Sequence, residues 1–407
     1  MHRITGILLT AVLAMLLFTA CSSVGAINGQ KYDLAKVGQD VVEGNSQFAF
    51  DLFKRLNSED EDESIFISPL SISTALTMTY NGAETSTKEA MEKTLGFKDL
   101  DRDLVNESYS NLLKYLQKAD KKVELNIANS IWIRQGQELN EDFLADNKLN
   151  FNAEITTLDF SDDSAVNTIN RWIDKATKGK IDKMLEPPID PDVIMYLINA
   201  IYFKGEWSKQ FDPARTYNGT FRKLDGSEET VQMMSLQDKV FYAEGDDYKA
   251  VRLPYGNGKM SMYAILPSES IDINKFIEDM TVEKWKDIRA SLAETDDVLV
   301  QIPKFKLEYG IKDLNDSLEY LGMGEALSEK ADFSGIREDI YISRVLHKAV
   351  IEVNEEGSKA AGVTVVEMKE AGAPEPITFI ADRPFMFIIA DELTGSLLFM
   401  GKLVSVH

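Results

Sequence analysis

The residue types that catalysis most often needs are scarce in this chain. It contains three histidines and one cysteine among 407 residues. His2 lies in an apolar leader, His407 is the last residue, and His347 stands in an apolar stretch, where a histidine is usually a hydrogen-bonded core residue. No HExxH, GxSxG, GxxxxGK or strand-linked GxGxxG motif occurs. We therefore predict that the protein is not an enzyme and that it uses no cofactor and no metal ion.

A stretch near the C-terminus, at 349–377, has a composition that is unusual for a loop. Residues 349–353 alternate like a strand, and a second strand pattern starts at Ile377. The segment between them, of about twenty residues, is rich in Gly, Ala, Thr and Val and ends in a turn-forming run at 373–376. Flexible loops usually carry Gly, Ser, Asn and Asp, whereas the run Val-Thr-Val-Val at 363–366 consists of strand formers. The composition indicates an exposed segment that is able to become a strand.

Length and charge narrow the classes of function. With 44% hydrophobic residues, 407 residues suffice for one large core or two ordinary domains. The net charge of −23 repels phosphate backbones, so we predict no nucleic-acid binding. The acidic run at 59–63 is interpreted as a solvated loop, because it lacks the alternating ligand pattern of a calcium site.

Residues 1–20 form a separate unit. A short positive start precedes an apolar run at 7–18, which is too short to span a bilayer and is typical of a secretory signal. Cys21 follows where a bacterial lipoprotein signal has its lipidated cysteine. We therefore expect an exported lipoprotein anchored at Cys21, at the cell surface or in the periplasm. Plain secretion is the alternative, since Phe18 is unusual in such a signal, and a lone cysteine leaves no intramolecular disulfide.

The body of the chain mixes helix and strand patterns. Residues 21–44 predict a tether, although several side chains could dock part of it on the body: Tyr32, Leu34, Val37, Val41 and Val42. A helix pattern starts at Ser46, and Ser68 with Pro69 opens a second, buried helix. Further helices are expected at 85–95, 104–116 and about 166–173, and strands at 125–133, 193–203, 220–266, 298–307, 342–353 and 377–404. Without repeats or linkers, this predicts one α+β domain over 45–407.

Several motifs in this domain resemble, in order and spacing, those of the serpins, a family of serine protease inhibitors. They are SIFISPLS at 64–71, NAIYFKGEW at 199–207, LHKA at 346–349, EEGS at 355–358, RPF at 383–385 and LFMGK at 398–402. The resemblance covers residues 45–407. It implies three β-sheets, about eight or nine helices and an exposed reactive loop at about 355–378.

The resemblance also implies a mechanism. In inhibitory serpins the loop is offered to a serine protease, and attack on the loop forms an acyl-enzyme. The cut loop then inserts as a new strand into the central sheet and distorts the tethered protease. The native fold is therefore held kinetically rather than by the lowest free energy. This would explain why a long exposed segment consists of strand-forming residues.

Alternation along the loop fits such an insertion. Counting from Ser358, the residues that would face the sheet interior are uncharged and small or β-branched: Ser358, Ala360, Gly362, Thr364 and Val366. Lys359 and Glu367 would face outward, which matters because burying an unpaired charge costs several kcal/mol. The resemblance assigns the hinge to Glu355, Glu356, Gly357, Ser358, Ala360, Ala361, Gly362 and Thr364.

The family motifs also match this chain at residues around the point where the central sheet opens. The residues that resemble the family's polar cluster beneath this point are Ser68, Ser71, Asn199 and His347. Trp207 resembles the aromatic residue at the top of the opening. Glu355 resembles the hinge acid that pairs with a lysine on the neighbouring strand, here Lys304. Core packing or a surface ion pair would be compatible with the same residues.

The family spacing from the hinge puts the reactive bond between Ala371 and Gly372. A small residue there suits the shallow pockets of elastase-like or subtilisin-like serine proteases, which are the expected targets. Counting back from Pro384 gives Ala373 instead, because this chain has about two extra residues there. Other protease classes would use one of the neighbouring residues: Met368, Lys369 or Glu370.

The sequence thus predicts a monomeric inhibitor of serine proteases that acts as a suicide substrate. A non-inhibitory serpin acting as a carrier or chaperone would share every scaffold motif and differ mainly in the loop. A lipidated solute-binding protein would share the signal and the acidic surface, but it should show two lobes with repeated βαβ units, and these patterns are absent.

The lipid anchor can be tested by replacing Cys21. Several acyl chains hold a protein on a membrane stably, whereas one chain binds only reversibly. We expect Cys21→Ser to release the protein into soluble fractions or to leave its signal uncleaved, as measured by cell fractionation and mass of the mature chain. Unchanged membrane association of the variant would rule out an anchor at this residue.

Overall fold

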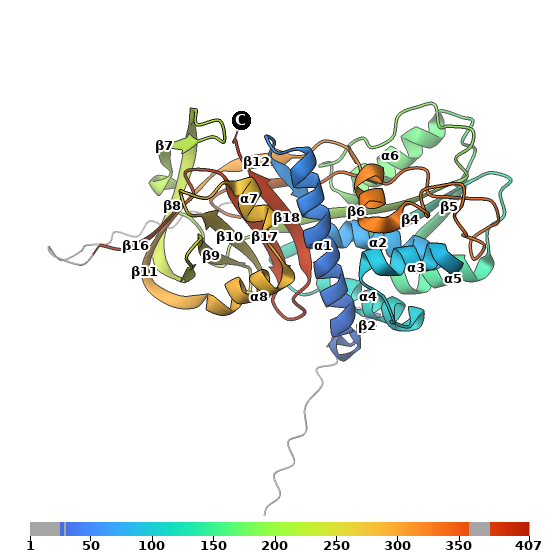
Figure 1. Ribbon diagram of the computed structural model, residues 1–407, viewed down its shortest axis with the longest axis horizontal. Coiled ribbons are helices and arrows are strands. Elements are labelled where there is room, and N and C mark those ends of the chain that lie inside the picture. The colour runs from blue at the N-terminus through green and yellow to red at the C-terminus, as the bar shows by residue number, and fades with distance from the viewer. Residues whose placement is uncertain (1–24, 28–29, 358–374, 407) are drawn as a thin grey trace, which may run out of the picture.

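The computed structural model describes residues 25–27, 30–357 and 375–406. Helices and strands alternate along the chain and pack as shown in Figure 1. The α-helices of the described residues are α1 (Gln39–Glu59), α2 (Pro69–Tyr80), α3 (Thr85–Leu95), α4 (Arg102–Leu116), α5 (Glu141–Phe151), α6 (Ser164–Ala176), α7 (Ile273–Glu278), α8 (Val282–Ser291) and α9 (Asn315–Leu318). Shorter helical turns are η1 (Leu34–Lys36), η2 (Pro213–Arg215) and η3 (Glu319–Met323).

The strands are β1 (Gly25–Ile27), β2 (Gln30–Tyr32), β3 (Ile65–Ile67), β4 (Val123–Arg134), β5 (Glu154–Leu158), β6 (Met195–Gly205), β7 (Tyr217–Arg222), β8 (Glu228–Glu244), β9 (Tyr248–Tyr255), β10 (Met260–Pro267), β11 (Ala293–Pro303), β12 (Phe305–Glu308), β13 (Lys312–Asp313), β14 (Leu346–His347), β15 (Val350–Val353), β16 (Ile377–Ile380), β17 (Phe385–Asp391) and β18 (Leu397–Leu403). The order of helices and strands confirms the α+β class and the predicted number of helices.

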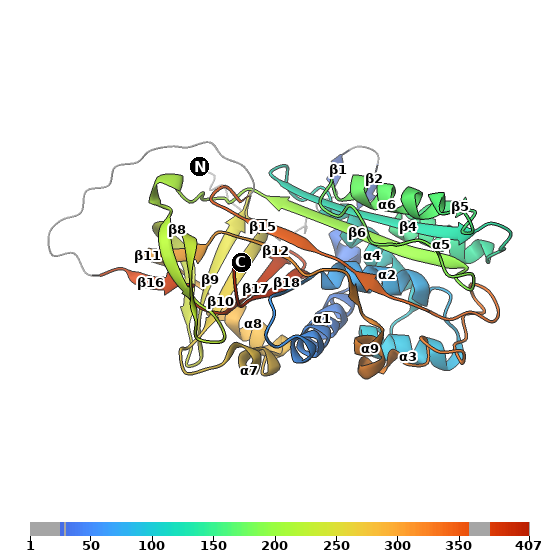
Figure 2. The same ribbon diagram turned by 90° about the horizontal axis from the view of Figure 1, so that it is seen from above.

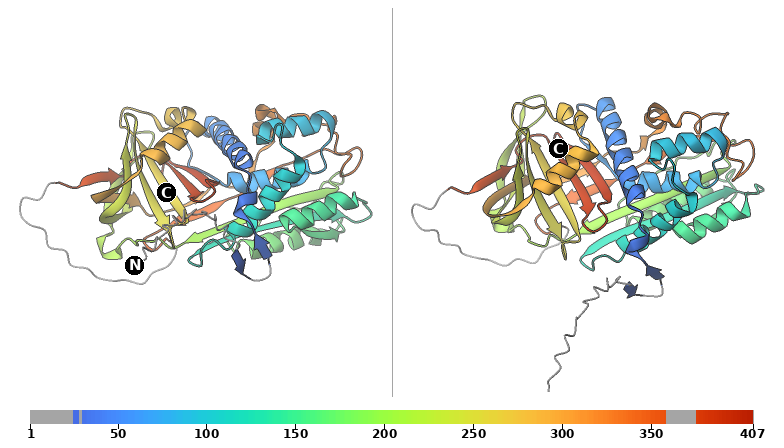
Figure 3. Two further views of the ribbon diagram at one scale, coloured as in Figure 1. Left: turned by 90° about the horizontal axis from the view of Figure 1, so that it is seen from below. Right: turned by 60° about the horizontal axis from the view of Figure 1, so that its bottom comes forward.

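The larger strand system is a nine-stranded sheet in the order β16-β11-β8-β9-β10-β17-β18-β3, with β7 paired to β8. The long strand β8 joins two parts of this sheet, because its first residues pair with β7 and its last residues with β9. β17 and β18 are buried along their whole length, including their two charged residues, Asp391 and Lys402, and the rest of each strand is apolar or glycine. These two parts and a separate central sheet make up the three sheets expected. Figure 3 shows the nine-stranded sheet and the strands β4–β6 at opposite ends of the molecule.

The central sheet is divided into two groups of strands. On one side β4 pairs with β5 and with β6. On the other side β12 pairs with β15, and β13 with β14. Among the described residues no strand pairing joins β6 to β14 or β15, although β15 runs alongside β6 (Figure 2). We call the space between β6 and the strands β14 and β15 the sheet gap.

Helix α2 lies beneath the sheet gap and is almost entirely buried, as predicted. Ser68 is its N-cap, and the Ser68 side chain accepts a hydrogen bond from the backbone N–H of Ser71. Pro69 occupies the first turn, where its missing N–H leaves no donor without a partner. These two residues therefore determine where the helix begins, and residues along its length line the cavity in the gap.

The N-terminal part of the body differs from the prediction. Helix α1 begins at Gln39 rather than at Ser46, and Val41 and Val42 are buried on it. The predicted tether over 21–44 is therefore wrong for its last residues, which are helix. Sequence periodicity missed this start because polar residues and a glycine at 43–47 separate Val41 and Val42 from the next apolar residues, and because the N-cap is a glycine without a side-chain hydrogen bond.

The segment before α1 docks on α4, which is the alternative that the sequence left open. The backbone N–H of Asp33 donates to Asn111 Oδ1 at 2.8 Å, and that of Gly38 donates to Ser108 Oγ at 2.9 Å. The ring of Tyr32 packs edge-on against that of Tyr115, with 5.6 Å between centroids. Leu34 and Val37 also pack against the core.

The stretch 342–353 forms two short strands rather than the single strand predicted. Only 346–347 and 350–353 pair with other strands. The preceding residues bond elsewhere: the Val345 N–H donates to the side chain of Asn315, and the Ile342 N–H donates to the carbonyl of Ala326. Helices α5, α7, α8 and α9 were not predicted, and α7 and α9 are only 6 and 4 residues long. None of the helices in the described part of the chain is long and apolar enough to span a membrane.

Candidate functional site

A cavity of about 630 Å³ lies in the sheet gap. Its floor is α2, one wall is the first half of β6, and the opposite wall is the segment 340–347. Its outer side is covered by residues of the stretch 184–190. Three of the predicted residues, Ser71, Asn199 and His347, line this cavity. Residues from three distant parts of the sequence thus meet where a further strand could enter the sheet.

His347 connects one wall of the gap to the start of α2. The backbone N–H of Ser68 donates to His347 Nε2 at 3.1 Å, and the Ser68 hydroxyl donates to the carbonyl of Leu398 at 2.7 Å. Because Nε2 accepts a bond, the neutral imidazole carries its proton on Nδ1. His347 is only 5% exposed, and this burial lowers its pKa to about 4. The ring is therefore neutral at pH 7.

Asn199 connects the other wall to the same helix. The Ser71 hydroxyl donates to Asn199 Oδ1. Asn199 Nδ2 then donates to Asn129 Oδ1 at 2.6 Å, and Asn129 Nδ2 donates to the carbonyl of Phe151 at 2.7 Å. Asn129 and Asn199 stand opposite each other in the β4–β6 register. Sequence reasoning missed Asn129, although an amide within an alternating strand was a signal for a buried polar partner.

This polar network does not have the geometry of a nucleophile and its base. A serine hydrolase needs a serine hydroxyl that donates to the imidazole. Here the hydroxyl of Ser68 donates to Leu398 and that of Ser71 to Asn199, while Nε2 of His347 receives a backbone N–H. The network can instead exchange hydrogen-bond partners when the walls of the gap separate.

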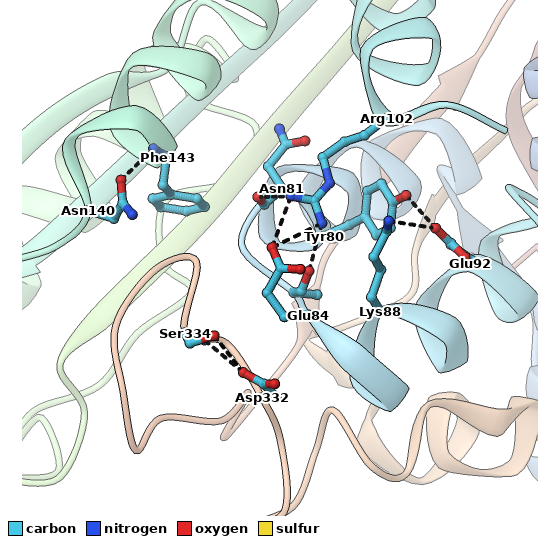
Figure 4. Close-up of polar contacts among 11 residues, drawn as sticks. Tyr80, Asn81, Glu84, Lys88, Glu92, Arg102, Asn140, Phe143, Asp332 and Ser334 are labelled. Carbon is cyan, nitrogen blue, oxygen red and sulfur yellow. Dashed lines mark hydrogen bonds and ion pairs between the residues drawn. The ribbon is translucent and has the colours of Figure 1, made fainter.

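The far end of α2 is held in place by Arg102 (Figure 4). Its guanidinium donates to the carbonyls of Asn81 at 3.0 Å and Ala83 at 2.7 Å, and it lies 3.4 Å from a carboxylate oxygen of Glu84. A cation bonded to the last carbonyls of a helix is a favourable C-terminal cap. Arg102 thus bonds the C-cap residue of α2 and the turn that follows it.

The top of the sheet gap is closed by backbone bonds around Trp207. The Trp207 N–H donates to the carbonyl of Glu356 at 2.9 Å, and the indole Nε1 donates to the carbonyl of Asn354 at 2.9 Å. The indole is stacked on Tyr255, with 4.3 Å between ring centroids and planes 12° apart. A rigid aromatic pair thus holds the end of β6 against the chain that follows β15.

Glu355 adds an ion pair to this closure. Lys304 Nζ donates to Glu355 Oε2 at 3.0 Å, and Thr216 Oγ1 donates to Oε1 at 2.9 Å. Burial tends to raise the pKa of Glu355, but its backbone hydrogen bond and the bonds from Lys304 and Thr216 outweigh burial and lower it. The carboxylate is therefore charged at neutral pH. The structure brings together the two residues that the resemblance paired.

Gly357 ends the described part of the hinge in a position that only glycine can occupy. Its φ is +89°, and a Cβ there would lie 2.1 Å from the Gly205 carbonyl oxygen.

The remaining predicted loop residues lie outside the described residues: Ser358, Ala360, Ala361, Gly362, Thr364, Lys369, Glu370, Ala371, Gly372 and Ala373. Cys21 also lies outside them. In the part of the chain that the structure describes, no group of three or more His, Cys, Asp or Glu side chains could hold a metal ion.

Comparison with known proteins identifies the family. The family model of the serpins, described as serine protease inhibitors, matches residues 43–406. The chain therefore belongs to the serpin family, whose members are normally protease inhibitors and not enzymes.

The chain is similar over most of its length to serpins of distant organisms. It is 34% identical to an uncharacterized serpin-like protein of Methanosarcina mazei, over 99% of this chain and 98% of that one. It is also 34% identical to the leukocyte elastase inhibitor of Bos taurus, over 89% and 98% of the two chains. Among solved structures, the thermophilic serpin tengpin in the native state matches with a TM-score of 0.81 and 37% identity, over 91% and 95% of the chains.

The burial of His347 predicts a pH-dependent loss of native stability. Its pKa is about 4 in the folded state against 6.5 for the free side chain. Between these values the unfolded chain binds a proton that the folded chain does not, so the stability falls as the pH falls. The unfolded histidine is only half protonated at pH 6.5, and the folded one begins to bind a proton by pH 4.5. Between these two pH values the wild type should therefore lose about 2 kcal/mol more stability than His347→Gln in the first urea unfolding transition. Parallel losses in both proteins would contradict the prediction.

Proposed function

We propose that this protein inhibits serine proteases as a suicide substrate whose cleaved loop inserts into the sheet gap. The observation that carries the proposal is the sheet gap itself. Two groups of strands lie side by side without pairing, over a cavity lined by hydrogen-bonding side chains. The described chain ends at Gly357, at the top of this gap, and is described again from Glu375, ahead of β16 in the nine-stranded sheet. The segment between these residues therefore starts at the top of the gap.

The chemistry would be that of an interrupted proteolysis. The protease serine Oγ attacks the carbonyl carbon of the residue before the reactive bond, and the peptide C–N bond breaks. The new amino terminus leaves with a proton from the protease histidine, and an ester joins the loop to the protease. Insertion then competes with hydrolysis of this ester. A fast insertion gives a trapped protease, and a slow one gives a cleaved inhibitor and a free protease.

For the reactive bond we propose Ala371–Gly372, with Ala373, Lys369 and Glu370 as the alternatives. A small residue before the bond suits an elastase-like or subtilisin-like target. The similarity to the leukocyte elastase inhibitor of Bos taurus supports this class of target. We also propose that the protein acts outside the cytoplasm, anchored through Cys21.

A carrier function is the second candidate. It is favoured by a solved structure of thyroxine-binding globulin in complex with thyroxine, which matches this chain with a TM-score of 0.80 and 31% identity. A carrier would keep the scaffold but would not need to trap a protease. Incubation with a panel of serine proteases separates the two: an inhibitor gives a covalent protease complex that survives denaturant, and a carrier gives none.

The first inward position of the hinge tests the insertion step. Ser358→Arg would bury an unpaired charge when the loop inserts, whereas the uncut protein would not have to bury it. We expect native stability to change little and inhibition to fail, so that the variant is cut and the protease is released. The matched control is Ala361→Arg, which puts the same charge at an outward position and should still inhibit. Full inhibition by Ser358→Arg, measured as moles of inhibitor per mole of protease inactivated, would contradict insertion.

Cleavage of the loop should raise the melting temperature. Roughly a dozen residues would gain backbone hydrogen bonds worth about 0.5–1.5 kcal/mol each, and ordering them would cost about 1–2 kcal/mol each. The hydrogen bonds alone would not offset the ordering cost, so the stabilisation must come from burial of Ala360, Thr364 and Val366 and chiefly from completing the divided sheet. We expect the nicked protein to melt clearly above the intact one, with its C-terminal fragment still attached. A thermal melt before and after limited cleavage measures this; an equal or lower melting temperature would mean a serpin scaffold without the insertion mechanism.

A further inference from the structure

An open groove beyond the C-terminal end of α4 gathers lysines, although the net charge of the chain is −23. The groove has a volume of about 640 Å³ and lies where the turn after α4 meets the start of β4, the end of β6 and the residues after α6. Its charged residues are two carboxylates and five lysines: Glu124, Glu206, Lys118, Lys121, Lys122, Lys178 and Lys204. The groove is therefore basic within an acidic molecule, and we call it the lysine groove.

Two lysines of the groove are available to a partner. Lys178 forms an ion pair with Glu124 across the groove. Lys121 and Lys122 are exposed and make no ion pair in the part of the chain that the structure describes. Neighbouring positive charges without a carboxylate partner attract an anionic partner.

The turn that carries these two lysines is held in place by hydrogen bonds. The side chain of Asp120 accepts from the backbone N–H groups of Lys122 and Asn257. The N–H of Glu206, at the end of β6, donates to the carbonyl of Lys122 at 3.2 Å. Because the backbone is already ordered, a partner would not have to order it on binding.

The segment before α1 runs along α4 toward the lysine groove. Followed back from α1, its contacts with α4 move from Ser108 to Asn111 and then to Tyr115. Tyr115 lies next to the last residue of α4, and the groove begins two residues later, at Gln117. The chain that leads back toward the N-terminus therefore arrives beside the lysines.

The hairpin of β1 and β2 keeps the start of the chain at the same place. Gly25 is the register partner of Tyr32, whose ring packs against Tyr115, and β2 lies beside α4 (Figure 1). Gly25 is four residues from Cys21, a distance that an extended chain spans in at most about 14 Å. A lipid attached to Cys21 would therefore hold the lysine groove close to the membrane surface.

Local charge decides which membrane surface the groove fits. Each lysine near a surface rich in anionic lipid strengthens binding by about fivefold. This attraction and the opposing repulsion of acidic residues both fade within a Debye length, about 8 Å at physiological salt. The charges of the groove therefore matter more for this contact than the net charge of the whole protein.

We propose that the lysine groove binds the phosphate groups of anionic lipids through Lys121 and Lys122, and so orients the anchored protein on its membrane. This inference rests on the proposed anchor at Cys21, because two lysines alone are too few to hold the protein at a membrane. The groove borders the hinge, since Gly357 lies against the carbonyl of Gly205 at the end of β6. The start of the proposed reactive loop would then lie near the membrane surface.

The test attaches a single lipid chain to Cys21, which a thiol-reactive lipid would modify alone because the chain has no other cysteine. It uses the chain from residue 21 onward, which is the expected mature protein. One acyl chain binds a membrane only reversibly, so contacts made by the groove are measurable as tighter partitioning. Partitioning is measured by sedimentation with phosphatidylcholine vesicles that either contain about one third phosphatidylglycerol or contain none.

Removal of the two exposed lysines should weaken the contact with anionic vesicles only. We expect Lys121→Gln combined with Lys122→Gln to lower partitioning into the phosphatidylglycerol vesicles by about 25-fold, at fivefold for each lysine. Partitioning into pure phosphatidylcholine should not change. Salt at about 0.5 M should remove the difference between this variant and the wild type, because it screens the attraction.

A matched control removes the same charge from another face. Lys93 and Lys98 are exposed, on and just after α3, which lies on the opposite side of the molecule from β1 and β2 (Figure 2). Lys93→Gln combined with Lys98→Gln should partition like the wild type. An equal loss in this control would show that net charge alone explains the effect, and the proposal would be wrong.

The remaining outcomes separate the groove from the anchor. Equal partitioning of the wild type and the groove variant into anionic vesicles would overturn the role of the groove. Binding of soluble dextran sulfate through the same lysines, without a preference for anionic vesicles, would also overturn it in favour of a free polyanion. Neither result bears on the natural anchor, because the lipid is attached chemically here, and the fractionation of Cys21→Ser in cells tests that anchor by itself.

Discussion

The sheet gap, where the edge of β6 faces β14 and β15 without strand pairing, is the constraint on which the other features of this structure depend. A strand edge inside a sheet presents N–H and C=O groups that need partners and that can recruit another strand. Here two such edges face each other across the sheet gap. Side chains bridge them without joining them: His347 on one wall and Asn199 on the other both reach the first turn of α2. The two walls are thereby bridged by side chains, while no strand pairing joins their backbone edges in the described part of the chain.

The two ends of the sheet gap are closed in different ways. At the top, backbone bonds from 354–356 to Trp207 and Phe211 join the walls directly, and the ion pair of Glu355 reinforces them. Lower down, the walls are bridged by the polar network and by apolar contacts with the segment 177–193, which links α6 to β6. The chain that closes the top is also the chain that leads into the loop. An inserting loop would therefore continue from the closure that it has to displace, and need not find a distant site.

Local patterns predicted the helices and strands that carry strong periodicity or clear caps. The N-cap Ser68 with Pro69 placed α2, and alternation placed β4 and β6 within a few residues. Tertiary bonding escaped such patterns. The split between β14 and β15 arises because Ile342 and Val345 bond to loops, and the docked segment at 32–38 is held by side chains of α4. The paired positions of Lys304 and Glu355 came from a family resemblance, not from periodicity. Asn129 was missed because an amide within an alternating strand indicates a buried polar partner but does not show which residues it will contact.

An inhibitor of the proposed kind has to satisfy two opposing kinetic demands. The uncut protein must not take up its own loop, yet the cut protein must do so before water hydrolyses the ester. A single strong clamp would meet the first demand and fail the second. Here the barrier is divided among weak terms: a partly exposed ion pair between Lys304 and Glu355, worth little alone, and neutral hydrogen bonds of about 0.5–1.5 kcal/mol each. Many small terms that can be exchanged one at a time keep the native state closed while leaving a route by which a strand can enter.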